Sequence, residues 1–207
     1  MDAIIFDIDG TIWDSTPQAA VAWTQAVKEN ASVPFELTAK DLQNAFGKQM
    51  DILRDQLLAP LPPEERPEVL KACQKAQGEY LPKHPGTLYP DVYDALKELS
   101  EKIPLYIVSN CQTGYDTTCI ETTGIEDFIS GHLCYGETLL PKSGSIRKLM
   151  EREGLKDVVY VGDTPSDVQA CKDADVPFVW VTYGFGDVKD PDYTIDSLKE
   201  LPRLFDL

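Results

Sequence analysis

Two aspartates near the start of the chain, Asp7 and Asp9, form the carboxylate pair with the clearest chemical meaning in this sequence. The apolar run of residues 3–6 leads into them, and Gly10 and Thr11 follow. An apolar run of this length that is cut off by glycine is typical of a buried strand. Because a carboxylate at the end of a buried strand is costly unless a cation or hydrogen-bond donors meet it, the pair indicates a site for Mg²⁺ and a phosphoryl group.

Polar side chains also follow two later apolar runs. Ser109 and Asn110 come after residues 105–108, and Asp163 comes after residues 158–161. In parallel α/β sheets, sites form beyond the carboxyl ends of the strands. We therefore expect these three side chains to meet the first aspartate pair at one edge of a sheet.

The elements that would position these groups alternate along the chain. Patterns of buried strands lie at residues 3–6, 105–108, 158–161 and 178–181. Helical patterns lie at residues 91–101, 143–153 and 165–173. Strands that alternate with helices predict a parallel α/β sheet. After residue 186 we expect only a loop and a final short helix.

The segment from residue 15 to residue 85 differs, because it has no strand pattern. Helical patterns occur at residues 19–27, 39–46, 52–58 and 67–80, separated by proline-containing breaks. We expect an α/β core of residues 1–14 and 86–207, with residues 15–85 inserted after the first strand as a helical cap domain. The alternative is that these helices pack on the sheet as part of a single domain.

Composition limits the classes of partner. The net charge of −16 argues against nucleic-acid binding, which needs a basic surface. No apolar run reaches the roughly 18 residues of a membrane span, and no signal-peptide pattern begins the chain. Five cysteines without a CxxC pair indicate reduced thiols. We expect a cytoplasmic protein without membrane contact, present as a monomer or weak homodimer.

Four motifs resemble, in order, those of the haloacid dehalogenase superfamily. They are residues 7–11 (DIDGT), residues 108–110 (VSN), Lys142 and residues 162–167 (GDTPSD). The helical insertion resembles the cap of the phosphoglycolate phosphatase-like branch. This resemblance implies a Rossmann-like core, Mg²⁺ and an aspartyl-phosphate intermediate. One departure is that Pro141 precedes Lys142, whereas many relatives carry a Lys-Pro pair.

The first and fourth motifs supply the candidate reacting groups and metal ligands. Asp7 is the candidate nucleophile and a side-chain ligand of Mg²⁺, together with Asp163. Asp9 is the candidate general acid and base, and the resemblance implies that its backbone carbonyl is a further ligand. Asp167, one helical turn after Asp163, holds the metal's water shell, orients Lys142 or ligates the metal directly.

The other candidate residues bind the substrate. Ser109 and Lys142 are the expected phosphate clamps, because a hydroxyl and an ammonium group can both stabilise the transferring phosphoryl oxygens. Thr11 and Asn110 are expected to approach the same phosphate. Lys48, in a Gly-containing loop of the helical segment, is a candidate for the distal end of the substrate; the alternative is an exposed loop lysine.

We therefore predict a Mg²⁺-dependent phosphatase that acts on a small phosphorylated metabolite, with phosphoglycolate the leading candidate by resemblance. Superfamily branches that cleave carbon–halogen bonds lack the second aspartate, so Asp9 favours phosphoryl transfer. One alternative is a sugar phosphomutase similar to β-phosphoglucomutase. Another is a non-catalytic binding or regulatory protein on the same fold.

Overall fold

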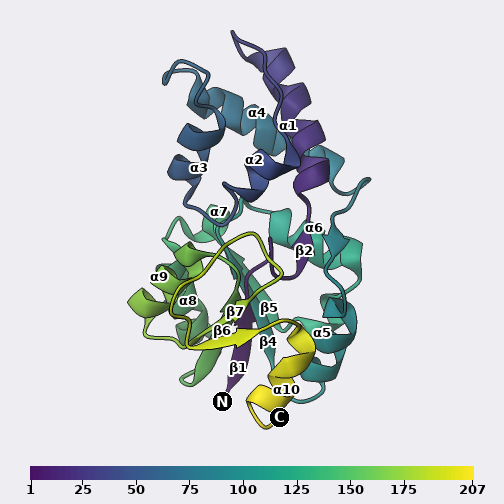
Figure 1. The fold of residues 1–207 in the computed structure, drawn as a ribbon, viewed down its shortest axis with the longest axis vertical. Coiled ribbons are helices and arrows are strands. Elements are labelled where there is room, and N and C mark those ends of the chain that lie inside the picture. Colours follow the sequence, from purple (N-terminus) through teal and green to yellow (C-terminus); the bar gives the residue numbers. More distant parts are fainter.

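In the computed structural model, which describes residues 1–207, a sheet with helices on both faces lies below a separate group of helices (Figure 1). The sheet has six strands in the order β5-β4-β1-β6-β7-β8, and every neighbouring pair is parallel. The strands are β1 (Ala3–Phe6), β4 (Leu105–Ser109), β5 (Gly131–Cys134), β6 (Val158–Gly162), β7 (Phe178–Val181) and β8 (Tyr193–Ile195). The predicted α/β fold with a parallel sheet is confirmed.

Four of these strands were predicted from their apolar runs, and the two edge strands were not. The prediction that only a loop and a short helix follow residue 186 was wrong, because β8 pairs there with β7. Its residues Tyr193 and Thr194 are exposed, so β8 lacks an apolar run. The other edge strand, β5, begins with Gly131 and His132, which are also atypical of a buried strand.

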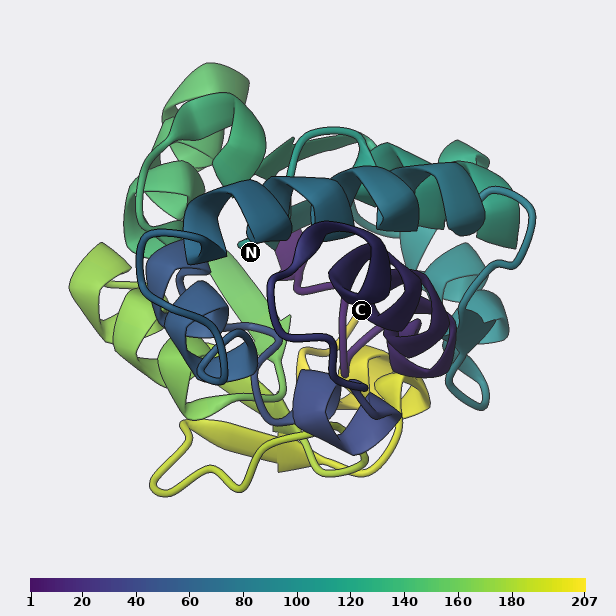
Figure 2. The same ribbon diagram turned by 90° about the horizontal axis from the view of Figure 1, so that it is seen from above.

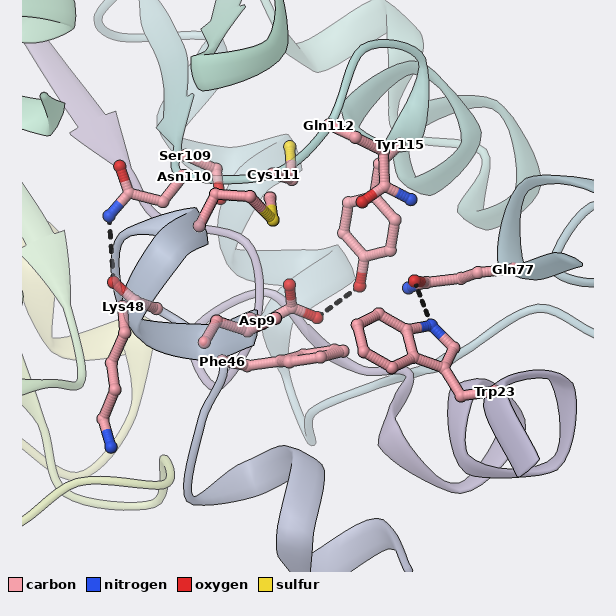
Figure 3. A pocket seen from close by; sticks show the side chains of 13 residues that line it. Asp9, Trp23, Phe46, Lys48, Gln77, Ser109, Asn110, Cys111, Gln112 and Tyr115 are labelled. Carbon is pink, nitrogen blue, oxygen red and sulfur yellow. Dashed lines mark hydrogen bonds between the residues drawn. The ribbon is translucent and has the colours of Figure 1, made fainter. Parts of the chain in front are cut away.

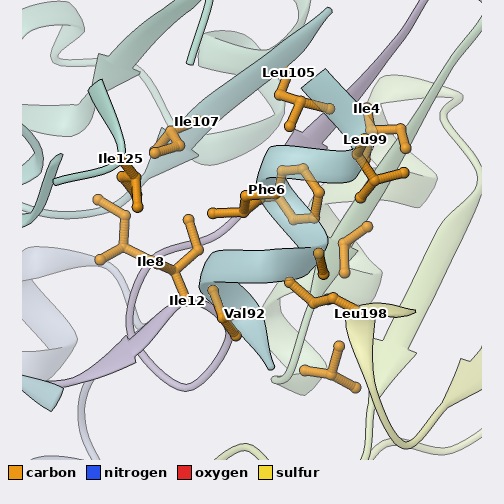
Figure 4. Close-up of a cluster of buried hydrophobic side chains, with 14 of the residues drawn as sticks. Ile4, Phe6, Ile8, Ile12, Val92, Leu99, Leu105, Ile107, Ile125 and Leu198 are labelled. Atoms are coloured by element: carbon orange, nitrogen blue, oxygen red, sulfur yellow. The ribbon is translucent and has the colours of Figure 1, made fainter. Parts of the chain in front are cut away.

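Both faces of the central strand β1 are buried by helices. Ile4 and Phe6 pack on one face (Figure 4), while Ala3 and Ile5 pack on the other. This alternation follows from the two-residue period of a strand, and it explains the uninterrupted apolar run of β1. The helices of the first face are α5 (Val92–Ser100) and α6 (Tyr115–Thr123), and those of the second face are α8 (Lys142–Glu153) and α9 (Pro165–Ala174).

Short elements complete the core. They are η1 (Glu126–Phe128), α7 (Tyr135–Thr138), η2 (Leu198–Glu200) and α10 (Leu201–Leu204). All five cysteines are free. None of the helices combines the length and the apolar character that crossing a membrane requires.

The inserted segment is entirely helical, as predicted. It contains α1 (Thr16–Asn30), α2 (Ala39–Gln43), α3 (Met50–Leu57) and α4 (Arg66–Tyr80). These helices enclose a hydrophobic cluster of their own, which is separate from the two clusters of the sheet. Seen from above, α1 and α4 lie side by side over the core (Figure 2). We propose that residues 15–85 form a cap domain.

The two crossings between core and cap pair with each other. Strand β2 (Trp13–Asp14) is antiparallel to β3 (Thr87–Leu88). Gly86 allows this close approach, since a Cβ atom there would lie 2.7 Å from the Trp13 ring. The Trp13 ring is fully buried and packs edge-on against Tyr115, with ring centroids 5.6 Å apart. This ribbon fixes where the cap joins the sheet.

Candidate active site

Three buried carboxylates meet at the carboxyl edge of the sheet. The carboxylate oxygens of Asp7, Asp163 and Asp167 lie within 4.8 Å of one another. Asp7 follows β1 and Asp163 follows β6, and these strands are direct neighbours in the sheet. Asp167 lies in the first turn of α9, where Thr164 and Asp167 form a capping box. Strand pairing therefore brings together residues that are far apart in the sequence.

Two glycines leave the space that Asp163 occupies. A Cβ atom on Gly10 would lie 2.0 Å from Asp163 Oδ2, and one on Gly184 would lie 2.2 Å from Asp163 Cβ. Gly10 also has a φ of +80°, which residues with a side chain rarely adopt. The backbone N–H of Phe185 donates to Asp163 Oδ2 at 2.7 Å. The Asp163 carboxylate is thus held between two backbone segments.

Lys142, the first residue of α8, supplies the positive charge. Its Nζ lies 3.0 Å from Asp7 Oδ2 and 2.5 Å from Asp167 Oδ1, and its side chain is buried. Burial alone would lower the pKa of Lys142, but the charges of Asp167 and Asp7 outweigh burial and raise it above the ordinary value. The lysine therefore stays protonated beside the candidate nucleophile, despite the departure of the surrounding sequence from the family pattern.

The donor set fits a hard divalent cation. Asp7 Oδ1 and Asp163 Oδ1 are enclosed and accept no hydrogen bond. Burial raises the pKa of Asp7 to about 6 and that of Asp163 above its ordinary value, and a bound cation would favour the ionised form of both carboxyl groups. Oxygen ligands of this kind suit Mg²⁺, which keeps positions open for water and phosphate.

Asp167 differs from the other two carboxylates because protein donors already satisfy both of its oxygens. Lys142 donates to Oδ1, while the Thr164 backbone N–H and hydroxyl donate to Oδ2 at 2.9 and 2.7 Å. Of the roles predicted for Asp167, this arrangement favours the orientation of Lys142.

Asp9 lines a pocket between core and cap (Figure 3). Its Oδ1 accepts hydrogen bonds from the hydroxyl of Tyr115 and, at 3.3 Å, from Ser15 Oγ. Burial raises the pKa of Asp9 to about 7. A carboxyl group with this pKa can give or take a proton near neutral pH. Sequence reasoning missed Tyr115 and Ser15, because no motif marks either residue.

The expected phosphate ligands lie around the same edge. Ser109 lines the pocket, and Thr11 Oγ1 is enclosed without a hydrogen-bond partner. Asn110 instead donates from Nδ2 to the Gly47 carbonyl in the cap at 2.9 Å, and Ser166 Oγ donates to the same carbonyl at 2.7 Å. Asn110 is therefore engaged in the contact between core and cap.

Lys48 lies in the cap loop between α2 and α3, at the rim of the pocket. Its Nζ donates to Gln56 Oε1 at 2.6 Å, and Figure 3 shows its side chain directed away from Asp9 and Phe46. The prediction that Lys48 holds the distal end of a substrate stays a prediction.

Residues 4–181 match the haloacid dehalogenase-like hydrolase family, and the chain belongs to that family of enzymes. Among its relatives are proteins named phosphoglycolate phosphatase, so the chain is similar to that branch. The protein from Vibrio vulnificus strain CMCP6 is 29% identical, with 96% of this chain and 93% of that protein covered. The protein from Escherichia coli K12 is 27% identical, with 96% and 90% covered.

Solved structures show the same fold over the whole chain. A predicted phosphoglycolate phosphatase from Haemophilus somnus has a TM-score of 0.82 at 24% identity, with 99% of this chain and 97% of that chain covered. A haloacid dehalogenase-like hydrolase from Streptococcus pneumoniae has a TM-score of 0.84 at 24% identity, with 99% and 98% covered. The capped α/β architecture is therefore shared with known members of the family.

Proposed function

We propose that this chain is a Mg²⁺-dependent phosphatase that hydrolyses a small phosphorylated metabolite through an aspartyl phosphate. The observation that carries the proposal is the position of Asp7, a buried carboxylate with a free oxygen beside Lys142 and close to Asp163. Asp9 lines the pocket, where it could protonate a departing leaving group. The family match and the named relatives support the same reaction class.

The mechanism divides hydrolysis into two displacements. The Asp7 carboxylate attacks phosphorus, and Asp9 protonates the departing alcohol oxygen. Asp9 then takes a proton from a water molecule that attacks the aspartyl phosphate, which restores Asp7. Lys142 and Ser109 stabilise the charge on the phosphoryl oxygens.

Asp7 and Asp163 would hold the metal, with the Asp9 carbonyl as the further ligand that we predicted. When bound, Mg²⁺ lowers the repulsion between the anionic nucleophile and the anionic phosphate. Cap closure would exclude bulk water from the intermediate. Phosphoglycolate is the first substrate to test, because the relatives carry that name.

Removal of divalent cations is expected to abolish phosphate release, and added Mg²⁺ is expected to restore it. Since the ligand set is formed only in the folded protein, saturating Mg²⁺ should also raise the melting temperature. A panel of phosphate monoesters, assayed with Mg²⁺ and with EDTA, measures the first effect, and thermal unfolding measures the second. Phosphate release that is unchanged in EDTA would contradict the metal dependence. Absence of release from every ester would favour the non-catalytic alternative, and conversion of a hexose phosphate to its isomer would favour the mutase.

Replacing Tyr115 by phenylalanine is expected to slow the hydrolysis of an alkyl phosphate by about tenfold, and that of p-nitrophenyl phosphate far less. The Tyr115 hydroxyl orients Asp9, and protonation by Asp9 matters only for leaving groups that are poor without a proton. The measurement is kcat for both esters. Tyr106→Phe is the matched control, because Tyr106 lies on β4 but does not line the pocket. Equal slowing of both esters would show a structural role for Tyr115 instead.

A further inference from the structure

The cap side of the pocket is mostly apolar. The residues that line this side are Trp23 of α1, Phe46 of the segment after α2, and Met50 and Leu53 of α3. Asp9 and Ser109 of the core also line the pocket. The Trp23 and Phe46 rings are tilted by 58° with centroids 6.3 Å apart. The enclosed cavity measures only about 30 Å³, so any group that it accepts must be small.

One fixed polar group interrupts this apolar wall. Gln77 of α4 is only 2% exposed, and its Oε1 accepts a hydrogen bond from Trp23 Nε1 at 2.8 Å. Because the indole N–H can only donate, the orientation of the Gln77 amide is determined, and its NH₂ group is the end left over. That NH₂ group has no acceptor within the protein, although Gln77 lines the pocket. The NH₂ group can therefore donate a hydrogen bond to an oxygen atom of a ligand bound in the pocket.

No free cationic group lines the cap side of the pocket. Its one cationic residue is Lys48, whose ammonium group is bound to Gln56 and directed away from the pocket. The one carboxyl group among the residues that line the pocket is that of Asp9. Placing a second carboxylate among apolar side chains without a cation is costly, whereas a neutral hydroxyl needs only hydrogen bonds.

We propose that Gln77 determines substrate specificity and that the substrate is the phosphate ester of a small, uncharged, hydroxyl-bearing alcohol. Its carbon atoms pack against Trp23 and Phe46, and one of its hydroxyl oxygens accepts a hydrogen bond from Gln77 Nε2. A leaving group with a carboxylate, such as glycolate, is disfavoured. The inference rests on the proposed phosphatase function, since it concerns the leaving group of that reaction.

The test compares kcat/KM for three esters with Mg²⁺: glycerol phosphate, ethyl phosphate and phosphoglycolate. We expect the unmodified enzyme to prefer glycerol phosphate. Gln77→Leu should lower kcat/KM for glycerol phosphate by about tenfold and change that for ethyl phosphate by less than about twofold, because ethanol has no second oxygen. Gln77→Glu keeps an acceptor for the Trp23 N–H and should cause the same selective loss, which guards against misfolding of the first variant.

Two further variants separate the explanations. Gln25→Leu makes the same change at an exposed glutamine of α1 and should leave all three values unchanged. Preference for phosphoglycolate, with a larger loss in Lys48→Met than in Gln77→Leu, would overturn the inference while the phosphatase proposal stands. Equal losses for glycerol phosphate and ethyl phosphate in both Gln77 variants would also overturn it. Absence of phosphate release from every ester would instead overturn the phosphatase proposal, and the inference with it.

Discussion

Asp7→Asn is expected to abolish phosphate release, with a loss of at least about 10⁴-fold in kcat, while the fold persists. An amide oxygen is a far weaker nucleophile than a carboxylate, and no aspartyl phosphate forms without Asp7. Its position at the end of β1, 3.0 Å from Lys142 Nζ, makes it the carboxylate best placed to attack. The measurement is phosphate release from the best ester of the panel, with purified protein and saturating Mg²⁺.

The expected effect of Asp7→Asn on the stability of the fold also has a definite direction. Burial raises the pKa of Asp7 from 3.8 to about 6, so the ionised carboxylate destabilises the metal-free fold as the pH rises through that range. Neutral asparagine avoids this cost, and Asp7→Asn without metal should unfold at pH 7 no more readily than the unmodified protein. Asp127→Asn, an exposed aspartate of η1, is the control for both measurements. Retained activity in purified Asp7→Asn would contradict its assignment as the nucleophile.

Lys142→Met is expected both to abolish turnover and to destabilise the fold by about 3–5 kcal/mol, because it leaves buried carboxylates without their counter-charge. Lys142 Nζ contacts both Asp7 and Asp167, and all three side chains are almost completely buried. Urea unfolding in the presence of EDTA measures the free energy, and phosphate release measures the activity.

A second substitution separates the two effects of losing Lys142. Lys142→Met combined with Asp167→Asn removes one unpaired charge and should recover part of the lost stability. It should not recover activity, since the Lys142 ammonium group is still missing beside the phosphoryl oxygens. Recovery of turnover in the double variant would contradict the role of Lys142 in catalysis. An unchanged free energy of unfolding in the single variant would contradict the buried ion pair.

The strands that position the site could be predicted because they are central. β1 and β6 are covered on both faces, so most of their residues are apolar and the pattern is visible without a partner. β5 and β8 are edge strands that contain exposed or polar residues. They are strands because a neighbour supplies hydrogen bonds, and that cause does not appear in a local pattern.

The residues of the candidate site also differ in whether the sequence alone could predict them. Short motifs contain Asp7, Asp163 and Lys142, and the types of these residues indicate their chemistry. Tyr115, which donates to Asp9, lies 106 positions from it in the sequence, and Gln77 lies 54 positions from the Trp23 that orients it. The first pair forms only when α6 packs beside the end of β1, and the second only when α1 packs against α4 within the cap. No spacing along the chain encodes either pair.

The sequence by itself therefore determined the residues that we propose for the phosphoryl end of the reaction: two aspartates after one strand, a third after its neighbour, and a lysine to balance them. Their chemistry follows from residue type, and the parallel sheet needs only its apolar runs to bring them together. The tertiary structure alone decided the residues that we propose for the leaving-group end. A pocket that lies between core and cap takes its shape, polarity and one free donor from the contacts between them, since burial and hydrogen bonding select which side chains face it.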